Sequence, residues 1–184
     1  LTVENNFDLF KTFNEWGVKG LKIDFMDRSD QWMVNYYERV AREAAKHHLF
    51  VDFHGSFKPA GLEYKYPNVL SYEGVRGMEQ MGGCYPDNSL YLPFMRNAVG
   101  PMDYTPGTFS DSQHPHITTY AHELALPVIF ESALQHMPDR PSVYYGLPEQ
   151  VKQFLSALPT AWDDTKLLAG YPGTEVVMAR RKGD

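Results

Sequence analysis

The chain has 184 residues, of which 43% are hydrophobic and 14% aromatic, and its formal net charge is −6. This composition excludes a disordered chain, and the lack of a basic stripe argues against nucleic acid as a partner. No apolar run approaches the roughly 20 residues of a membrane helix, so membrane insertion is not expected. A single cysteine, Cys84, cannot form a disulfide within the chain.

The first part of the chain alternates between helical and extended patterns. Apolar residues at helical spacing from Val3 onward predict a helix over residues 3–16, which Gly17 ends. Leu21, Ile23 and Phe25 predict a buried strand that closes near Asp24. The clearest helical pattern covers residues 30–48. Two further strands are expected over residues 49–53, before a loop that begins at His54, and over residues 69–73.

The second part of the chain is less regular. Residues 74–108 are rich in Gly, Pro and Met and lack periodicity, which is typical of a functional loop. Later elements are expected as a helix from His116 to Leu126, a strand from Val128 to Glu131, a helix over residues 147–158 and a strand over residues 174–180. The basic cluster Arg180-Arg181-Lys182 is expected to be a solvated tail.

The order of these elements predicts the fold class. Alternating strands and helices favour an α/β fold with a parallel sheet and outer helices. A complete (β/α)₈ barrel of the TIM type takes about 250 residues, so residues 1–184 are expected to be the second half of such a barrel. Half a barrel has unpaired strand edges, and the missing half is therefore an expected partner.

Acidic residues close three of the first four expected strands, at Asp24, Glu73 and Glu131, and Glu79 follows in the loop after Glu73. Side chains at the carboxyl ends of barrel strands line active sites. Two carboxylates are what glycoside hydrolysis needs, but the same acids could bind a hard cation such as Ca²⁺ or be structural. The pattern alone leaves these three interpretations open.

Strand alternation distinguishes Asp24 from the nearby Asp27. It places Lys22 and Asp24 on one face and Ile23 and Phe25 on the other. A lysine in a barrel could also form a Schiff base, as in an aldolase or lyase, although the number of carboxylates argues against this.

Several blocks of the sequence resemble glycoside hydrolase family 97. They are the run from Gly17 to Asp27, the run from Tyr66 through Glu73 to Glu79, the run from Pro93 through Gly100-Pro101-Met102-Asp103 to Gly107, and His122-Glu123-Leu124-Ala125-Leu126 with Phe130-Glu131-Ser132. They occur in order and cover nearly the whole chain.

The resemblance implies a larger protein with a β-sandwich domain, a (β/α)₈ catalytic barrel and a small C-terminal β domain. Residues 1–184 would be part of the barrel, with the sandwich, the early barrel strands and the C-terminal domain absent. The family acts on α-linked sugars, uses Ca²⁺ and contains inverting α-glucosidases as well as retaining α-galactosidase-type members. It implies an α-linked oligosaccharide substrate and a periplasmic or secreted location.

The resemblance also assigns the catalytic residues. The nucleophile of the retaining branch falls on Asp24 and the general acid/base on Glu79, whereas the base of the inverting branch falls on Gly55. A retaining exo-acting α-galactosidase is therefore expected, with an α-glucosidase of the same family or an inactive carbohydrate-binding fragment as alternatives.

The remaining expected site residues bind metal or substrate. Glu73 and Glu79 match family calcium ligands, and Lys22 matches a lysine that contacts sugar hydroxyls in related melibiase-type α-galactosidases. His54, Asp103 and Glu131 are expected to contact substrate. Their structural alternatives are a loop histidine, a turn cap and a brace at the barrel rim.

Overall fold

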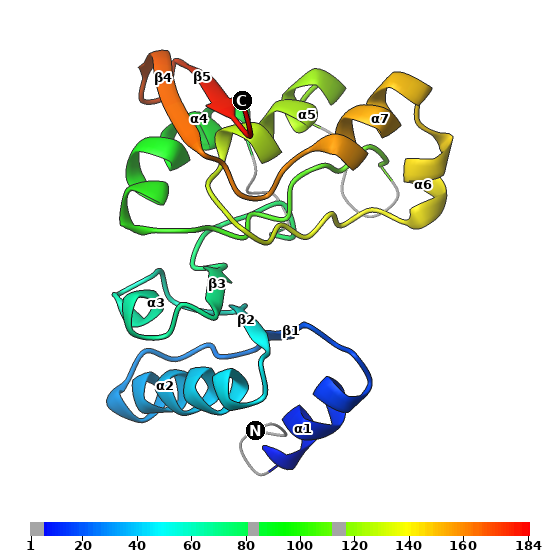
Figure 1. The fold of residues 1–184 in the computed structure, drawn as a ribbon. Helices are drawn as coiled ribbons and strands as arrows, with labels where there is room; N and C mark the ends of the chain where they lie inside the picture. Colours follow the sequence, from blue (N-terminus) through cyan, green and yellow to red (C-terminus); the bar gives the residue numbers. More distant parts are fainter. Residues whose placement is uncertain (1–5, 81–84, 112–116) are drawn as a thin grey trace. The chain divides into compact units, whose positions relative to one another are not determined.

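The computed structural model describes residues 6–80, 85–111 and 117–184. The chain divides into two compact units, Leu1–Val75 and Arg76–Asp184, whose elements are labelled in Figure 1. The expectations that involve Val3, Cys84 and His116 lie outside the described residues. Within the described ranges, no helix combines the length and the apolar character that crossing a bilayer requires.

The first unit is built on a three-stranded sheet in the order β1-β2-β3, with both neighbouring pairs parallel. Its elements are α1 (Asp8–Glu15), β1 (Gly20–Ile23), α2 (Gln31–Lys46), β2 (Phe50–Phe53), α3 (Leu62–Lys65) and β3 (Val69–Tyr72). Parallel neighbours need a crossover, and a helix lies between each pair of strands in the sequence. The predicted α/β class is confirmed, while membership of a half barrel stays a prediction.

Helix α2 forms where the sequence predicts it and covers the sheet. Asp30 caps its N-terminus by accepting a hydrogen bond from the Met33 amide at 3.1 Å. This bond, together with Arg28, lowers the pKa of the Asp30 carboxyl. The buried face of the helix consists of Met33, Tyr36, Tyr37, Val40, Ala41 and Ala44. Its Tyr37 ring packs against Phe53 of β2, with centroids 4.5 Å apart.

Strand β1 is shorter than the sequence pattern indicates. It ends at Ile23, which is buried, whereas Phe25 is 84% exposed and has a φ of +59°. The prediction that Phe25 shares the buried face of Ile23 is therefore wrong. The chain leaves the ladder because the Asp24 carboxylate accepts a hydrogen bond from the Phe25 amide at 2.6 Å, a local bond that competes with strand pairing.

The second unit is mainly helical and ends in a hairpin. Its elements are α4 (Pro86–Met95), the 3₁₀ turn η1 (Asn97–Val99), α5 (Tyr120–Ile129), α6 (Pro141–Gly146), α7 (Glu149–Ala157), β4 (Asp164–Tyr171) and β5 (Glu175–Arg181). The expected final strand is confirmed as β5. Its partner β4 runs antiparallel to it, a pairing that the expected alternation of parallel strands and helices does not include.

The expected strand from Val128 to Glu131 is wrong, because α5 continues through it to Ile129. The Phe130 amide donates to the Leu126 carbonyl at 2.9 Å, so the helical ladder reaches this point. The β-branched pair at residues 128 and 129 favours a strand locally. Burial of the helix face at Leu126 outweighs that preference, as tertiary packing commonly does.

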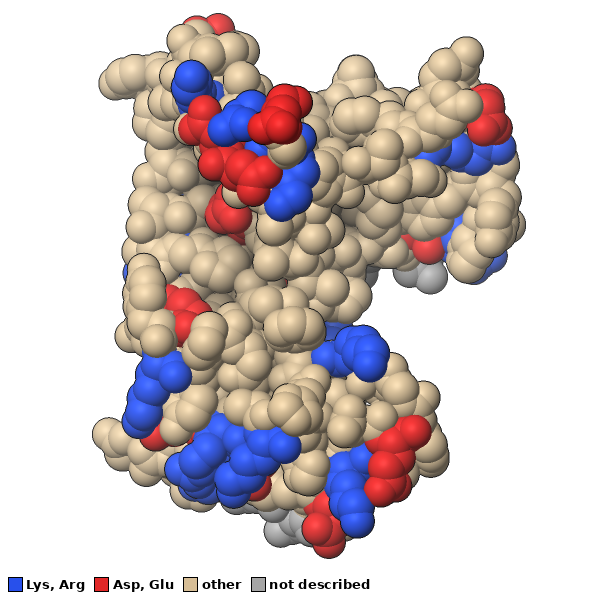
Figure 2. Space-filling model, viewed as in Figure 1, with Lys and Arg blue, Asp and Glu red and all other residues tan. Residues whose placement is uncertain are grey.

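Arg180 is not part of a solvated tail. It lies in β5, its side chain is 3% exposed, and it pairs with Glu131. It also donates to the Ile129 carbonyl at 3.1 Å. The neighbouring Lys182 lies 3.3 Å from Asp163, and Figure 2 shows basic and acidic side chains mixed at this end of the chain. Arg180 thus ties the hairpin to the end of α5.

Asp139 fastens the loop that follows Gly107. Its Oδ2 accepts the amides of Phe109 at 2.7 Å and Ser110 at 2.9 Å, and its Oδ1 accepts the Ser110 hydroxyl at 2.7 Å. Tyr144 extends the network by donating its hydroxyl to the Gly107 carbonyl at 3.1 Å. Burial raises the pKa of Asp139, but hydrogen bonds from Ser110 and Phe109 outweigh it and lower the pKa overall.

We expect Asp139→Asn to lower the free energy of unfolding by about 1–2 kcal/mol at pH 7, because hydrogen bonds to a charged acceptor are lost from a partly exposed site. A lowered folded-state pKa stabilises the protein above the unfolded value of about 3.9, and this contribution is lost as the pH falls through the folded value. The difference between wild type and variant should therefore shrink toward pH 3 in chemical denaturation. Asp184→Asn, at an exposed aspartate, is the matched control. A difference that stays constant with pH would contradict the role of the charge.

Candidate active site

Three of the predicted site residues follow the three parallel strands of the first unit. Asp24 comes directly after β1, His54 after β2 and Glu73 after β3. The ladder continues past the strand ends, because the His54 amide donates to Ile23 and the Glu73 amide donates to Phe53, each at 2.8 Å. The carboxyl ends of parallel strands share one edge of a sheet, so the three side chains lie together.

The Asp24 carboxylate lies near two nitrogen-bearing side chains. Its Oδ2 is 3.9 Å from Lys22 Nζ and 3.7 Å from His54 Nδ1, and its Oδ1 accepts the Phe25 amide at 2.6 Å. The side chain is 32% exposed. An aspartate held in this way is fixed in orientation while remaining accessible, as a nucleophile or a ligand must be.

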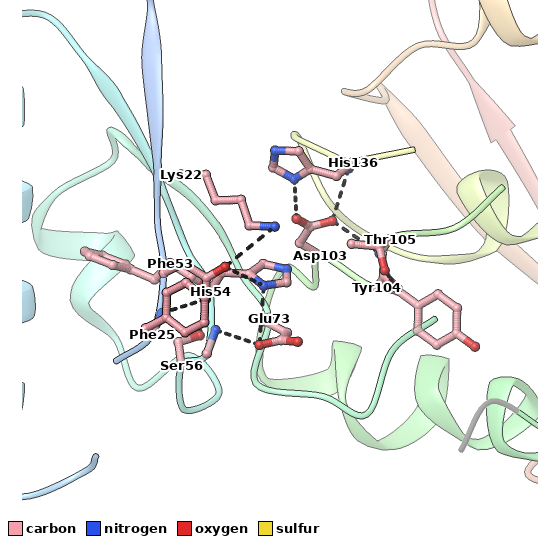
Figure 3. Close-up of polar contacts among 12 residues, drawn as sticks. Lys22, Phe25, Phe53, His54, Ser56, Glu73, Asp103, Tyr104, Thr105 and His136 are labelled. Atoms are coloured by element: carbon pink, nitrogen blue, oxygen red, sulfur yellow. Dashed lines mark hydrogen bonds and ion pairs between the residues drawn. The ribbon is translucent and has the colours of Figure 1, made fainter. Parts of the chain in front are cut away.

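Glu73 is 8% exposed and is held by the backbone of Gly55. Its Oε2 accepts the Gly55 amide at 2.6 Å and lies 3.5 Å from His54 Nδ1 (Figure 3). The His54 side chain, which is 3% exposed, therefore has a carboxylate oxygen of Asp24 and one of Glu73 within 4 Å of the same ring nitrogen.

Asp52 is a buried acid that the sequence interpretation missed. It is 0% exposed in the middle of β2 and is the register partner of Lys22 on β1 and of Ser71 on β3. The available signal was a charged residue between Val51 and Phe53 in an apolar strand. A polar row, Lys22-Asp52-Ser71, thus crosses the sheet just before the edge that carries the site.

Glu79 belongs to the second unit and is exposed. The turn that carries it is fixed because the Met78 amide donates to the Tyr104 carbonyl at 3.0 Å. A Cβ on Gly77 would lie 2.6 Å from the same Tyr104 oxygen, so only glycine permits this approach. The turn with Glu79 is therefore held against the segment that contains Asp103.

Asp103 is fully buried and pairs with His136, a residue that the sequence interpretation missed. Its Oδ2 lies 2.5 Å from His136 Nδ1, and its Oδ1 accepts the His136 amide at 3.1 Å and the Thr105 amide at 3.3 Å (Figure 3). An aspartate bonded to one imidazole nitrogen fixes the orientation of the ring. The substrate contact predicted for Asp103 stays a prediction.

The structure thus divides the predicted residues between the two units. Lys22, Asp24, His54 and Glu73 come together in the first, whereas Glu79, Asp103 and Glu131 lie in the second. Glu131 forms an ion pair with Arg180, and the substrate contact predicted for it stays a prediction. The pairing of Asp24 with Glu79 across a substrate stays a prediction.

Comparison with known sequences relates the chain to glycoside hydrolases. The model described as Glycoside hydrolase 97 matches residues 1–75. The chain is 44% identical to "Retaining alpha-galactosidase" of Bacteroides thetaiotaomicron over 94% of its own length. It is 42% identical to "Probable retaining alpha-galactosidase" of Streptomyces bingchenggensis over 99% of its length. It spans 28% of the length of each of these relatives.

Solved structures agree with the sequence matches. A Glycoside Hydrolase Family 97 enzyme from Pseudoalteromonas sp. strain K8 in complex with panose matches with a TM-score of 0.88 at 30% identity, covering 99% of this chain and 32% of that one. A beta-arabinopyranosidase matches with a TM-score of 0.87 at 32% identity, covering 97% of this chain and 30% of that one. These sequence and structure matches are all to proteins of glycoside hydrolase family 97 or to glycosidases, and they confirm the resemblance that the sequence blocks predict.

We expect Asp103→Ala to lower the free energy of unfolding by about 2–3 kcal/mol, because buried backbone donors lose their acceptor. Asp103→Asn keeps one oxygen for these amides and should cost about half as much. Asp87→Ala, at an exposed acid in the first turn of α4, is the control and should change stability by less than about 1 kcal/mol. Chemical denaturation of the purified protein measures all three. Equal losses for Asp103→Ala and Asp87→Ala would show that the buried network is not stabilising.

Proposed function

We propose that the protein to which this chain belongs is a retaining exo-glycoside hydrolase that cleaves terminal α-linked sugars, with α-galactosides as its main substrates. The observation that carries the proposal is the Asp24 carboxylate, which is partly exposed and oriented at the carboxyl edge of the sheet between Lys22 and His54. The names of the two curated relatives support both the retention and the sugar.

In the proposed reaction, an oxygen of Asp24 attacks the anomeric carbon as the bond from that carbon to the leaving oxygen breaks. Glu79 donates its proton to the leaving oxygen. A water molecule then gives a proton to the Glu79 carboxylate and attacks the same carbon, which releases Asp24 and restores the protonated acid. Double displacement of this kind needs carboxyl groups about 5 Å apart.

Neighbouring groups prepare Asp24 for this role. Lys22 Nζ and His54 Nδ1 both face its Oδ2, which fixes the direction in which the carboxylate points. The Phe25 amide holds Oδ1 at 2.6 Å. We further propose that Lys22 contacts a sugar hydroxyl, since its ammonium lies beside the Asp24 carboxylate and is a hydrogen-bond donor. Gly55 has no side chain that could activate water directly.

The donor set is compatible with Ca²⁺, which prefers carboxylate oxygens. Glu73 presents a nearly buried carboxylate whose Oε2 is fixed by the Gly55 amide, and we propose that Glu73 and Glu79 hold the ion. When bound, Ca²⁺ would supply a fixed positive charge beside the substrate. Fixing the Glu73 carboxylate in advance lowers the entropy cost of binding the ion.

The remaining parts of the proposal concern the rest of the polypeptide. The chain spans 28% of the curated relatives, and we propose that further strands of the same polypeptide complete a (β/α)₈ barrel and that a sandwich domain accompanies it. A periplasmic or secreted location also belongs to the proposal. The complete site then requires the whole protein.

An α-glucosidase is the second candidate. Two solved structures support it. They contain a family 97 enzyme from Pseudoalteromonas sp. strain K8, one in complex with panose and one with acarbose, and each structure matches this chain at 30% identity. The beta-arabinopyranosidase neighbour adds a third sugar to test. β-L-Arabinopyranosides share the ring configuration of α-D-galactopyranosides and lack only the exocyclic carbon. Nitrophenyl glycosides of all three sugars should therefore be compared.

We expect the intact protein to hydrolyse p-nitrophenyl α-galactoside fastest and to release the α-anomer first, as proton NMR of the early product will show. Asp24→Asn should lower kcat by roughly 10⁴-fold, the scale on which loss of a catalytic nucleophile falls. Asp27→Asn is the matched control, because Asp27 is an exposed aspartate three residues away, and it should keep activity within a fewfold. A first-formed β-anomer, or a larger loss for Asp27→Asn than for Asp24→Asn, would refute the assignment.

We expect removal of Ca²⁺ by a chelator to lower both turnover and the thermal unfolding midpoint, because an ion that binds only the folded state stabilises it by about 2.7 kcal/mol at a hundred times its Kd. Glu73→Gln should abolish most of the calcium-dependent shift in the midpoint, whereas Glu15→Gln on the exposed face of α1 should not. Midpoints that are the same with and without the ion would exclude a calcium site.

A further inference from the structure

Gly55 connects the ends of all three strands through its backbone. Its amide donates to Glu73 Oε2 at 2.6 Å, and its carbonyl accepts the Asp27 amide at 2.8 Å. Residue 55 itself directly follows His54, the residue after the end of β2. The two backbone bonds therefore fix the position of residue 55 relative to the acids that follow β1 and β3.

The position that a Cβ would occupy at Gly55 faces Asp24. A Cβ at this position would lie 3.0 Å from the Phe25 nitrogen, 3.1 Å from Asp24 Oδ1 and 3.2 Å from Asp27 Oδ1. Ordinary carbon contacts are longer, at about 3.5–4.0 Å. The φ of Gly55 is +56°, which already disfavours any residue with a side chain.

The Asp24 carboxylate cannot move away from such a group without losing its own contacts. Its Oδ1 is held by the Phe25 amide at 2.6 Å. Its Oδ2 faces His54 Nδ1 at 3.7 Å and Lys22 Nζ at 3.9 Å. A rotation that moves Oδ1 away from residue 55 also moves Oδ2 relative to both of these nitrogen atoms. The empty volume at Gly55 and the orientation of Asp24 therefore depend on each other.

We propose that Gly55 is a positioning residue for the Asp24 carboxylate, and that the absence of a side chain at residue 55 sets where this carboxylate lies. The proposal rests on the function proposed above for Asp24. It extends that function, because it assigns a role to a residue that has no reactive group. The same backbone segment also places Glu73 through its amide, so one peptide orients two acids.

The expected effect follows from how sharply reaction rates depend on geometry. A nucleophile displaced by about 1 Å can lose 10²-fold in rate. Gly55→Ala adds one carbon atom within 3.2 Å of Asp24 Oδ1, and we expect kcat to fall roughly 10²-fold with little change in KM. The Gly55 amide remains in this variant, so its hydrogen bond to Glu73 can persist.

Gly17→Ala supplies the matched control. Gly17 also has a positive φ, of +84°, but nothing lies within 4 Å of a Cβ built on it. Both alanine variants carry the cost of an unfavourable backbone conformation, and only Gly55→Ala places an atom against Asp24. The experiment measures kcat, KM and thermal midpoint for both variants of the intact protein, and crystal structures of both variants locate the Asp24 carboxylate.

The proposal predicts a loss in midpoint for both variants, a large loss of kcat for Gly55→Ala alone, and a displaced Asp24 carboxylate in its crystal structure. It is overturned if Asp24 occupies the same position in both variants, or if their kcat values agree within a fewfold. The crystal structures decide this point even if the wild-type protein proves not to hydrolyse glycosides. In that case the proposed function fails and the steric dependence of Asp24 on residue 55 is judged separately.

Discussion

The site depends on a parallel backbone ladder that continues past the ends of its strands. The His54 amide bonds to Ile23 and the Glu73 amide bonds to Phe53, each at 2.8 Å, although both donors lie beyond the last strand residue. These bonds hold the loops in register with the sheet. Without them, Asp24, His54 and Glu73 would be separate loop residues, and the 3.5–3.9 Å distances among their charged groups and Lys22 would not be maintained. Helix α2 supports the arrangement from the opposite face by burying the apolar side of the same strands.

Much of the first unit could be predicted from the sequence because its signals are local. Short apolar runs mark the strands, two of which are followed by an acid, and the cap at Asp30 and the helical spacing up to Lys46 mark α2. The failure at Phe25 has an equally local cause, since the Asp24 side chain bonds the next amide and ends the strand early. Side chains alternate between the two faces of the sheet only as far as the backbone hydrogen bonds of the strand continue.

The second unit was harder to predict because its structure rests on contacts between distant segments. The run Val128-Ile129 is β-branched and favours a strand, yet it completes α5. Helix α4 lies within the stretch 74–108, which lacks periodicity in the sequence, and β4 leaves most of its residues exposed, so neither gives a clear apolar pattern. His136 meets Asp103 across 33 residues. Such a pair can be found only from three-dimensional contacts, whereas the acids at the strand ends can be found from their position in the sequence after an apolar run.

The ion pair between Arg180 and Glu131 has a consequence for exchanging segments between relatives. The Arg180 side chain is 3% exposed, and it belongs to a hairpin that follows the last helix of the chain. An unpaired charge at such a site is costly, so the two positions cannot change independently. A chimera that joins this hairpin to the α5 end of a relative would need a carboxylate at the position of Glu131. The change from helix to antiparallel strand suggests a segment boundary between α7 and the hairpin. The ion pair shows instead that the hairpin and the end of α5 have to be exchanged together.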